Sequence, residues 1–301
     1  MQKTLKIAIV GLGVIGGSFA WALKKQTTFP VHLMGIDHDQ KTLDQALREG
    51  AIDEGEIKNQ QILQKADLVI ITLYPSDVVD FVETHQKDFK TGAILTDTTG
   101  VKGDLIDKIG ACLPENVDFI FGHPMAGKES QGFAYADGDI FQDANYLITP
   151  IESNKQENIK FLTQLFKTLG FKRVSEVTPQ LHDEMIAFVS QLCHIIAVSL
   201  INSDKPGRQT ADFVGDTYRE LTRIAKINAP LWNELFLYNK KELLTVMEGF
   251  QSQFNLLKEA IEQEDQETLI ALLEEGMVRR TALEQADSKL QAAADNKEYN
   301  L

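Results

Sequence analysis

Three short segments of this chain carry imidazole, amide or guanidinium groups in settings where they could act on a substrate. The first is residues 122–127 (GHPMAG), in which His123 directly follows a predicted strand. At the carboxyl end of a strand, an imidazole could take the proton of a hydroxyl group while a hydride leaves the same carbon. A loop histidine held by a backbone carbonyl is the alternative on position alone. His123 is therefore the candidate catalytic base.

The other two segments lie within predicted helices. Gln191 and His194 are three residues apart, so both side chains project from one helix face. Arg223 stands among apolar residues, and its guanidinium could bind a carboxylate through two hydrogen bonds. A core histidine at position 194 and a surface ion pair between Glu220 and Arg223 are the alternatives. Gln191, His194 and Arg223 are the candidate substrate-binding residues.

The start of the chain has the pattern of a nucleotide-binding turn. An apolar run at residues 6–10 leads into GLGVIG at residues 11–16, and apolar residues at helical spacing follow. In this context Gly11 permits a tight turn, Gly13 lets backbone N–H groups approach a pyrophosphate, and Gly16 lets the helix pack against the strand. The helix N-terminus adds unpaired donors and a positive dipole end. The pattern predicts a dinucleotide-binding domain, with a plain glycine turn as the alternative.

The end of the second predicted strand indicates which dinucleotide is bound. Residues 31–36 form that strand, and Asp37 follows it, 21 residues beyond Gly16. A carboxylate there accepts hydrogen bonds from ribose hydroxyls and repels a 2′-phosphate, so the predicted cofactor is NAD rather than NADP. The predicted cofactor-binding residues come from the glycine turn, the end of the second strand and the turn after residues 68–73: Gly11, Gly13, Val14, Ile15, Gly16, Asp37, Leu73 and Pro75.

The elements that must position these groups change once along the chain, from alternating strands and helices to helices alone. Up to residue 177, short β-rich runs alternate with helical stretches, which is typical of an α/β Rossmann-type fold with a doubly wound parallel sheet. The strands are expected at residues 6–10, 31–36, 68–73, 93–97, 119–122, 145–149 and 172–177. We predict a dinucleotide-binding domain at residues 1–177, with its chemistry at the carboxyl ends of the strands.

The second half of the chain shows helical periodicity only. Thr178 and Pro179 form an N-cap followed by proline, and helical spacing continues to about residue 293. We predict an all-α domain at residues 178–301 that binds substrate and forms a homodimer, with the active site in the cleft between the domains. An intramolecular bundle would give the same apolar pattern. One apolar stripe comprises Leu235, Phe236, Leu243, Leu244, Met247, Phe250, Phe254 and Leu257.

Composition narrows the class of partner. A net charge of −14 over 301 residues argues against nucleic-acid binding, and an anionic substrate would require a locally positive site. No uninterrupted apolar run of about 18 residues occurs, so we predict no membrane span. Cys112 and Cys193 lie outside any C-x-x-C pair, which favours a reducing, cytoplasmic location. We expect a small-molecule substrate and no metal.

The motifs occur together in a recognisable order. GLGxIGGS, DxxxVKG, GHPMAG, PxxHD, LxH and TRIAxxxxxxW follow one another between about Lys6 and Phe254. In this the chain resembles the prephenate or arogenate dehydrogenase family, which makes the precursor of tyrosine. GHPMAG and TRIA are far more specific than the glycine turn. The resemblance implies that His123 accepts a hydrogen bond from the ring hydroxyl, that His194 recognises the substrate, and that Arg223 binds the ring carboxylate.

Two positions depart from the family pattern. Many members have a serine directly before VKG, where this chain has Gly100. Thr98 or Thr99 could supply the hydroxyl instead. A histidine often stands where this chain has Gln191, so one polar contact near the nicotinamide differs.

The resemblance implies a reaction. It is the NAD-dependent oxidative decarboxylation of prephenate to 4-hydroxyphenylpyruvate, CO2 and NADH. Arogenate carries an amine in place of the side-chain keto group, and a non-acidic His194 favours prephenate over it. A hydroxyacid or imine-type dehydrogenase, which commonly uses a lysine or aspartate of its helical domain, is an alternative. A nucleotide-binding regulator that senses NADH without turnover is another.

Overall fold

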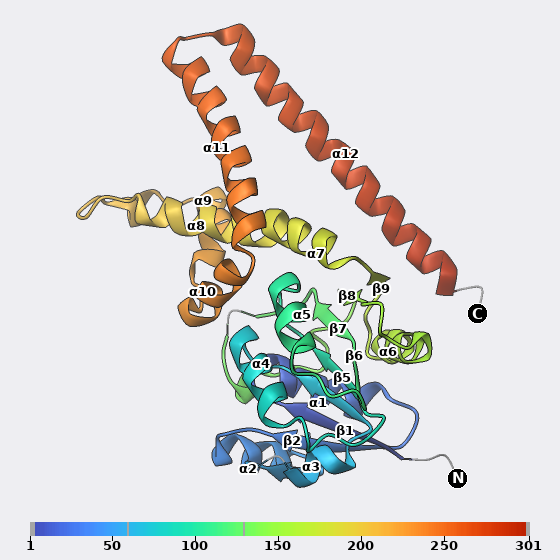
Figure 1. Cartoon of the computed structure of the whole chain (residues 1–301). Coiled ribbons are helices and arrows are strands. Elements are labelled where there is room, and N and C mark those ends of the chain that lie inside the picture. Colours follow the sequence, from blue (N-terminus) through green and yellow to red (C-terminus); the bar gives the residue numbers. More distant parts are fainter. Residues whose placement is uncertain (1–3, 59, 129, 299–301) are drawn as a thin grey trace. The chain divides into compact units, whose positions relative to one another are not determined.

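The computed structural model describes residues 4–58, 60–128 and 130–298, and divides into two compact units, Met1–Glu242 and Leu243–Leu301. The first unit is built on a parallel sheet of six strands in the order β3-β2-β1-β4-β5-β6 (Figure 1). The elements of this layer are β1 (Leu5–Val10), α1 (Val14–Gln26), β2 (Val31–Ile36), α2 (Gln40–Glu49), β3 (Glu54–Glu56), α3 (Gln60–Lys65), β4 (Leu68–Ile71), α4 (Pro75–Thr84), β5 (Ile94–Asp97), α5 (Gly103–Gly110) and β6 (Asp118–Phe119).

Alternate residues of the central strands pack into two hydrophobic cores, one on each face of the sheet. Ile7 and Ile9 of β1 pack on one face with α1 and α2, whereas Ala8 and Val10 pack on the other with α3, α4 and α5. All four residues of β4 are buried, as a strand covered on both faces requires. The predicted Rossmann-type sheet is therefore confirmed. Its strand order reverses between β1 and β4, which is where such folds bind ligands at the carboxyl ends of the strands.

The predicted strand at residues 119–122 is wrong in its extent, because it divides into two strands of different sheets. The N–H of Ile120 donates to Leu95 O (2.8 Å), the last backbone-to-backbone bond to β5, and Phe121 then pairs with Thr149. β7 (Phe121–Pro124), β8 (Asn145–Thr149) and β9 (Arg173–Glu176) form a second sheet in which β7 is antiparallel to β8. His123 therefore lies within β7 rather than after a strand.

Helices follow the second sheet, as the sequence predicts. Thr178 accepts a hydrogen bond from Leu181 N and Pro179 opens the helix, so α7 begins where its cap signal places it. A π-helical turn, η2, then separates α7 from α8. The remaining elements of this unit are η1 (Phe133–Tyr135), α6 (Gln156–Thr168), α7 (Pro179–Ile186), η2 (Ala187–Gln191), α8 (Leu192–Asn202), η3 (Thr210–Phe213), α9 (Asp216–Thr222), η4 (Arg223–Ala225) and α10 (Ala229–Tyr238).

The continuous helical segment Pro179–Asn202 is long and apolar enough to cross a membrane, with a mean hydropathy of 1.8 over its most apolar window. Its polar residues are nevertheless bonded within the protein. Asp183 accepts from backbone N–H groups at the start of α5, and Gln191 bonds to Leu235 O of α10. These contacts tie the segment to the first unit, and 28% of its most apolar window is buried.

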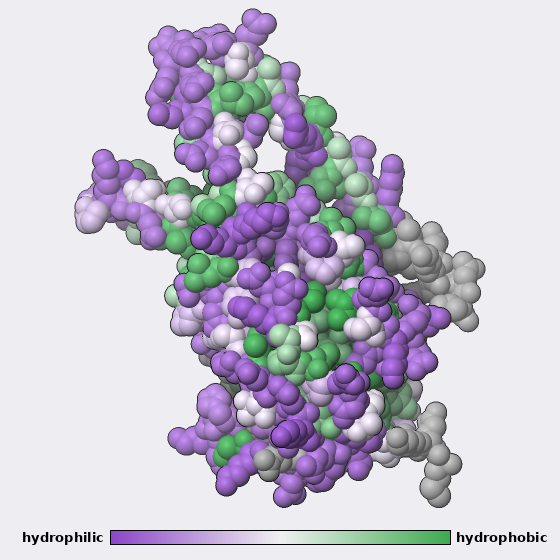
Figure 2. Space-filling model, viewed as in Figure 1, coloured by the Kyte–Doolittle hydropathy of each residue, from purple (hydrophilic) through white to green (hydrophobic). Residues whose placement is uncertain are grey.

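The second unit consists of α11 (Lys240–Glu262), from Leu243 onward, and α12 (Gln266–Glu298). The predicted apolar stripe is not continuous, because Leu235 and Phe236 belong to α10, which ends at Tyr238, and the other residues belong to α11. The predicted domain boundary between residues 177 and 178 stays a prediction. Figure 2 shows hydrophobic residues at the surface of this unit. Its large exposed apolar residues are Leu244, Phe250, Phe254, Leu256, Ile261, Ile270, Leu273, Met277, Val278, Leu283 and Leu290.

Candidate active site

A cavity of about 640 Å³ lies in the first unit, a size that suits a small ligand or part of a cofactor. Its wall joins the glycine turn to the ends of β4 and β5, to β7 and the loop after it, and to the segments η2–α8 and η4–α10. Of the predicted site residues, those in the wall are Gly13, Val14, Ile15, Leu73, Pro75, His123, Gln191 and His194. Gly11, Gly16, Asp37 and Arg223 are not among the described wall residues.

The three glycines of the turn differ in backbone conformation and in the space available for a side chain. Gly11 has φ +84°, a left-handed conformation that favours glycine. A Cβ on Gly16 would lie 1.9 Å from Gly11 O, so α1 approaches β1 as closely as the sequence pattern predicts. A Cβ on Gly13 would meet nothing within 4 Å, and Gly13 borders the cavity. The turn therefore leaves its open side toward the cavity.

The N-terminus of α1 faces that open side. Its N-cap is Gly13, which has no side chain to bond the first N–H groups, and Val14 and Ile15 border the cavity. Unpaired N–H donors at a helix N-terminus bind phosphate oxygens well. The residues present thus fit a dinucleotide pyrophosphate.

Asp37 supports the same turn from the end of β2. Its Oδ2 accepts a hydrogen bond from Leu12 N (2.7 Å), and its Oδ1 accepts one from Asp39 N (2.9 Å). A carboxylate offers about four lone-pair sites, so acceptor capacity remains for ribose hydroxyls. The side chain is mostly buried, with 9% exposed. Asp37 is thus fixed beside the turn without forming part of the cavity wall.

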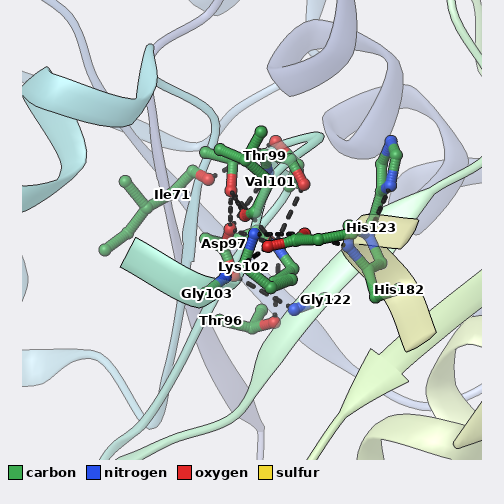
Figure 3. A network of polar contacts seen from close by, with 12 residues as sticks. Ile71, Thr96, Asp97, Thr99, Val101, Lys102, Gly103, Gly122, His123 and His182 are labelled. Carbon is green, nitrogen blue, oxygen red and sulfur yellow. Dashed lines mark hydrogen bonds and ion pairs between the residues drawn. The ribbon is translucent and has the colours of Figure 1, made fainter. Parts of the chain in front are cut away.

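His123 lies in the wall and contacts a second histidine (Figure 3). Its Nδ1 is 3.0 Å from His182 Nε2, and His182 Nδ1 is 2.7 Å from Asp183 Oδ1. Burial lowers the pKa of His123 well below its usual value, and the charges of His182 and Lys102 lower it further. Burial also lowers the pKa of His182, against the opposing effect of Asp183. Both rings are therefore neutral near pH 7, and His123 can accept a proton.

A buried ion pair lies next to His123. Lys102 Nζ is 2.7 Å from Asp97 Oδ2, and neither side chain has exposed surface. Asp97 Oδ1 also accepts from Gly122 N (3.0 Å), one residue before His123. Thr99 completes the cluster, since its hydroxyl donates to Asp97 Oδ2 and its carbonyl accepts from Lys102 Nζ. This cluster fixes the end of β5 against the strand that carries His123.

His194 stands in the wall beside an aromatic ring. Its Nδ1 is 2.9 Å from Ser190 O, and its ring centroid is 3.7 Å from that of Trp232. Because a carbonyl only accepts, His194 Nδ1 carries the proton that it donates to Ser190 O. The histidine is thus oriented by its own helix and by α10.

Gln191 is in the wall, but its polar atoms bond to the protein. It is 1% exposed, its Nε2 donates to Leu235 O (2.9 Å), and its Oε1 accepts from Asn239 Nδ2 (2.9 Å). Arg223 is exposed on η4, and Lys226, three residues later, borders the cavity. The structure therefore gives Gln191 a bridging position between α8 and α10, and adds Lys226 as a cation at the wall.

Gly100, which occupies the position where many family members have a serine, lies beside His123. A Cβ on Gly100 would be 3.6 Å from His123 Nε2, an ordinary contact distance. Both threonines border the cavity, but the Thr99 hydroxyl bonds within the buried cluster, whereas the Thr98 hydroxyl makes a 3.5 Å contact with Ile71 O. Of the two threonines, Thr98 is the better placed to supply a hydroxyl.

Sequence reasoning missed several polar residues of this site. His182 and Asp183 were seen only as part of the PxxHD motif, although a His-Asp pair one turn after a helix cap is itself a signal. Lys102 was likewise seen only as part of the DxxxVKG motif, and Lys226 was not singled out, because burial and cavity position depend on tertiary packing. Among the residues that the structure describes, no group of three or more His, Cys, Asp or Glu could hold a metal ion.

A Rossmann-type sheet, an open glycine turn and a neutral histidine in one cavity define an NAD-dependent dehydrogenase. Two family models match the chain: the nucleotide-binding domain of prephenate dehydrogenase over residues 19–175 and the dimerization domain of prephenate dehydrogenase over residues 178–275. The chain belongs to the prephenate dehydrogenase family, which confirms the resemblance drawn from the motifs.

Individual relatives agree with this assignment. The prephenate dehydrogenase of Bacillus subtilis is 29% identical over 274 residues, which is 89% of this chain and 73% of that protein. The structure of prephenate dehydrogenase from A. aeolicus in complex with hydroxyphenyl propionate and NAD+ is 28% identical, with a TM-score of 0.84 over 93% of this chain and 99% of that one. Synechocystis arogenate dehydrogenase is 26% identical, with a TM-score of 0.79 over 93% of this chain and 100% of that one.

Proposed function

We propose that this protein catalyses the NAD-dependent oxidative decarboxylation of prephenate to 4-hydroxyphenylpyruvate and CO2. One observation carries the proposal: a neutral His123 lies in a cavity whose wall also includes the open glycine turn. A hydride acceptor and a proton acceptor can thus serve the same substrate carbon. When bound, NAD+ supplies the hydride acceptor, and Gly13, the N-terminus of α1 and Asp37 would hold it.

His123 has one task in this reaction. Its neutral ring accepts a hydrogen bond from the ring hydroxyl of the substrate and takes that proton as the carbonyl forms. When CO2 leaves, the electron pair of the broken C–C bond makes the ring aromatic and leaves a phenolate oxygen, to which protonated His123 returns the proton. The protein therefore needs to orient the ring and to move one proton off and back onto the same oxygen, and His123 can serve for both transfers.

The charges around the cavity favour prephenate over arogenate. Lys128 and Lys226 border it, and the described part of the wall contains no Asp or Glu. Glu129 lies outside the described residues. A wall with cations suits the two carboxylates of prephenate, whereas the ammonium of arogenate would need an anionic partner. We assign the ring carboxylate to Arg223, by the family motif, and the side-chain carboxylate to Lys226.

Gln191 and His194 have different parts in this proposal. His194 is held by Ser190 O and packs against the Trp232 ring, so it forms a firm side wall for the ring of the substrate. Gln191 keeps α8 and α10 together at the cavity, because both of its bonded atoms reach α10 or the residue after it. We therefore place Gln191 behind the substrate-binding surface.

We also propose that the protein is a cytoplasmic homodimer joined through its helical domain. The matched family model for residues 178–275 is a dimerization domain, and α11 and α12 expose a series of large apolar residues. An apolar surface of that kind is typical of an interface. Cys112 and Cys193 are both free thiols, which suits a reducing compartment.

The proposed reaction has a simple test. The purified protein is incubated with prephenate and NAD+, and NADH, CO2 and 4-hydroxyphenylpyruvate are each measured. Formation of all three in equal amounts supports the proposal. NADH without CO2 would indicate a hydroxyacid-type dehydrogenase, and NADH binding without any turnover would indicate a regulator.

A further inference from the structure

Two buried side chains behind His123 have no part in the proposed reaction as described so far. His182 and Asp183 are adjacent residues of α7, 1% and 6% exposed, and His182 contacts His123 at its Nδ1 (Figure 3). The three groups form a line from Asp183 Oδ1 through His182 to His123, with contacts of 2.7 and 3.0 Å. This line connects the helical part of the unit to the strand β7.

The direction of each hydrogen bond in the line follows from the chemistry of its ends. A carboxylate only accepts, so His182 Nδ1 carries the proton that it donates to Asp183. In the neutral His182 ring, Nε2 is then an acceptor, and His123 Nδ1 must donate to it. The proton of the neutral His123 ring is thereby placed on Nδ1. Its Nε2, the atom 3.6 Å from the Cβ position of Gly100, is left as the acceptor.

The carboxylate of Asp183 is held in place by other hydrogen bonds, so it can fix the direction of the hydrogen bonds in this line. Its Oδ1 also accepts from Lys102 N (2.9 Å), and its Oδ2 accepts from Gly103 N (2.7 Å), at the start of α5. Its backbone carbonyl accepts from Asn239 Nδ2 (2.9 Å). The carboxylate therefore cannot rotate away from His182 without losing its two bonds from the start of α5, and the bond from Asn239 holds the backbone of the same residue in place.

We propose that His182 and Asp183 are positioning residues that hold His123 with its proton on Nδ1 and its Nε2 free to act as the base. This inference rests on the proposed function for its kinetic consequence, but not for its statement about the tautomer. A ring with the proton on Nε2 would present a donor to the substrate hydroxyl and could not remove its proton. Such partners behind a working histidine commonly contribute about 10–100-fold in activity.

The tautomer is tested first, in the full-length protein without substrate. Nitrogen NMR of protein labelled with 15N-histidine distinguishes protonated from unprotonated ring nitrogens. Only six histidines contribute signals, and the signal of His123 is assigned from its loss in His123→Asn. We expect His123 to be protonated at Nδ1 and unprotonated at Nε2. A proton on Nε2 of His123 in the wild type overturns the inference.

A matched pair of variants tests the consequence. In His182→Gln, the amide group reaches the position of Nε2, and its oxygen can accept from His123 Nδ1. In His182→Asn, the amide group reaches only the position of Nδ1, so the bond to Asp183 is kept and the bond to His123 is lost. We expect His182→Asn to lower kcat about 10–100-fold with KM and NAD affinity within about twofold, and His182→Gln to recover most of that loss.

The control is a second His-Asp pair that does not border the cavity. His85 Nδ1 is 2.8 Å from Asp88 Oδ2, at the end of α4, and neither residue borders the cavity. His85→Asn should leave kcat unchanged. Equal kcat values for folded His182→Asn and the wild type would overturn the inference. If the wild type has the expected tautomer but does not oxidise prephenate, the proposed function fails and the positioning role stands.

Discussion

His123 lies beside His182 and close enough to Lys102 for that buried charge to act on its ring, and both neighbours oppose a positive charge there. Burial acts in the same direction and is the largest of the three effects. A histidine of this kind is a poor cation and a ready hydrogen-bond acceptor. The chemistry of the site therefore depends on where the imidazole is placed as much as on the residue type.

The first expectation concerns the removal of this base. His123→Asn should lower kcat about 10²–10⁴-fold, the usual contribution of general-base assistance, while KM for prephenate changes little. Steady-state kinetics with the melting temperature as a folding control measures both. A loss of less than about threefold in a folded variant would make His123 a structural residue.

The lowered pKa of His123 also sets the pH range of activity. The ring must be neutral to accept a proton, and activity is lost as the pH falls through its pKa. Because that pKa lies well below 6.5, we expect kcat/KM to stay level from pH 7 to below 6.5 before it falls. A pH profile of kcat/KM whose acid limb is centred at or above 6.5 would contradict this account of the ring's environment.

Two cations are assigned to the carboxylates of the substrate. Arg223→Ala and Lys226→Ala should each raise KM for prephenate about tenfold or more and lower kcat less, because the contacts exist already in the ground state. NAD affinity should not change. Lys167→Ala, on the last turn of α6, is the control with unaltered kinetics. A variant whose KM matches the wild type removes that residue from the site.

The sequence located some site residues better than others, for a physical reason. His123 and His194 were singled out because their spacing and strand or helix context are local, and both border the cavity. The internal bonding of Gln191 and the cavity position of Lys226 depend on how α8, η4 and α10 pack. His182 required knowledge of which strand faces α7. Tertiary contacts of this kind leave no trace in local spacing.

At the scale of elements, two glycine-to-alanine substitutions in the glycine turn should have different effects. One should lower the stability of the fold, and the other should weaken the binding of NAD. A Cβ on Gly16 would overlap Gly11 O at 1.9 Å, whereas a Cβ on Gly13 would meet nothing within 4 Å. We expect Gly16→Ala to lower the melting temperature markedly. Gly13→Ala should fold normally and bind NAD at least tenfold more weakly, because its methyl group occupies the open side of the turn.

Melting curves and NAD titrations of the two variants decide this point. If Gly13→Ala binds NAD as tightly as the wild type, the pyrophosphate does not approach at this turn. If Gly16→Ala melts like the wild type, the close contact between α1 and β1 is not as tight as described.

Most helices and strands were predicted because their apolar residues recur at clear helix or strand spacing. The strands β1, β2, β4, β5 and β8 are buried apolar runs, and the start of α7 is marked by its cap and proline. The short strand β3 was not predicted, since its three residues, Glu-Gly-Glu, have no apolar pattern. The division at Ile120 was missed because a continuous apolar run can leave one sheet and enter another without any change in sequence character.

At the scale of the whole molecule, the net charge of −14 and the anionic substrate appear opposed. The conflict is resolved locally, since the described cavity wall has lysines and histidines but no carboxylates. The Asp and Glu residues that the structure describes lie outside this wall. Electrostatic selection between substrates can therefore operate at the cavity without a positive protein as a whole.

Dimer formation gives a separate expectation for the molecule. Sedimentation should show a mass of twice 33.7 kDa for the wild type. Phe254→Glu places a charge on a 58%-exposed apolar residue of α11 and should shift the protein toward the monomer. Leu47→Glu, on the exposed face of α2, is the matched control and should remain dimeric. A monomeric wild type, or a fully dimeric Phe254→Glu, would contradict the proposed interface.

The most direct test of the whole account is a comparison of kcat/KM for four combinations: prephenate or arogenate with NAD+ or NADP+. Asp37 at the end of β2 predicts NAD+ over NADP+, and the cationic cavity wall predicts prephenate over arogenate. We expect prephenate with NAD+ to exceed each of the other three combinations at least tenfold. A preference for arogenate, or for NADP+, would contradict the account of the cavity or of Asp37, and no NADH from any combination would contradict the proposed reaction itself.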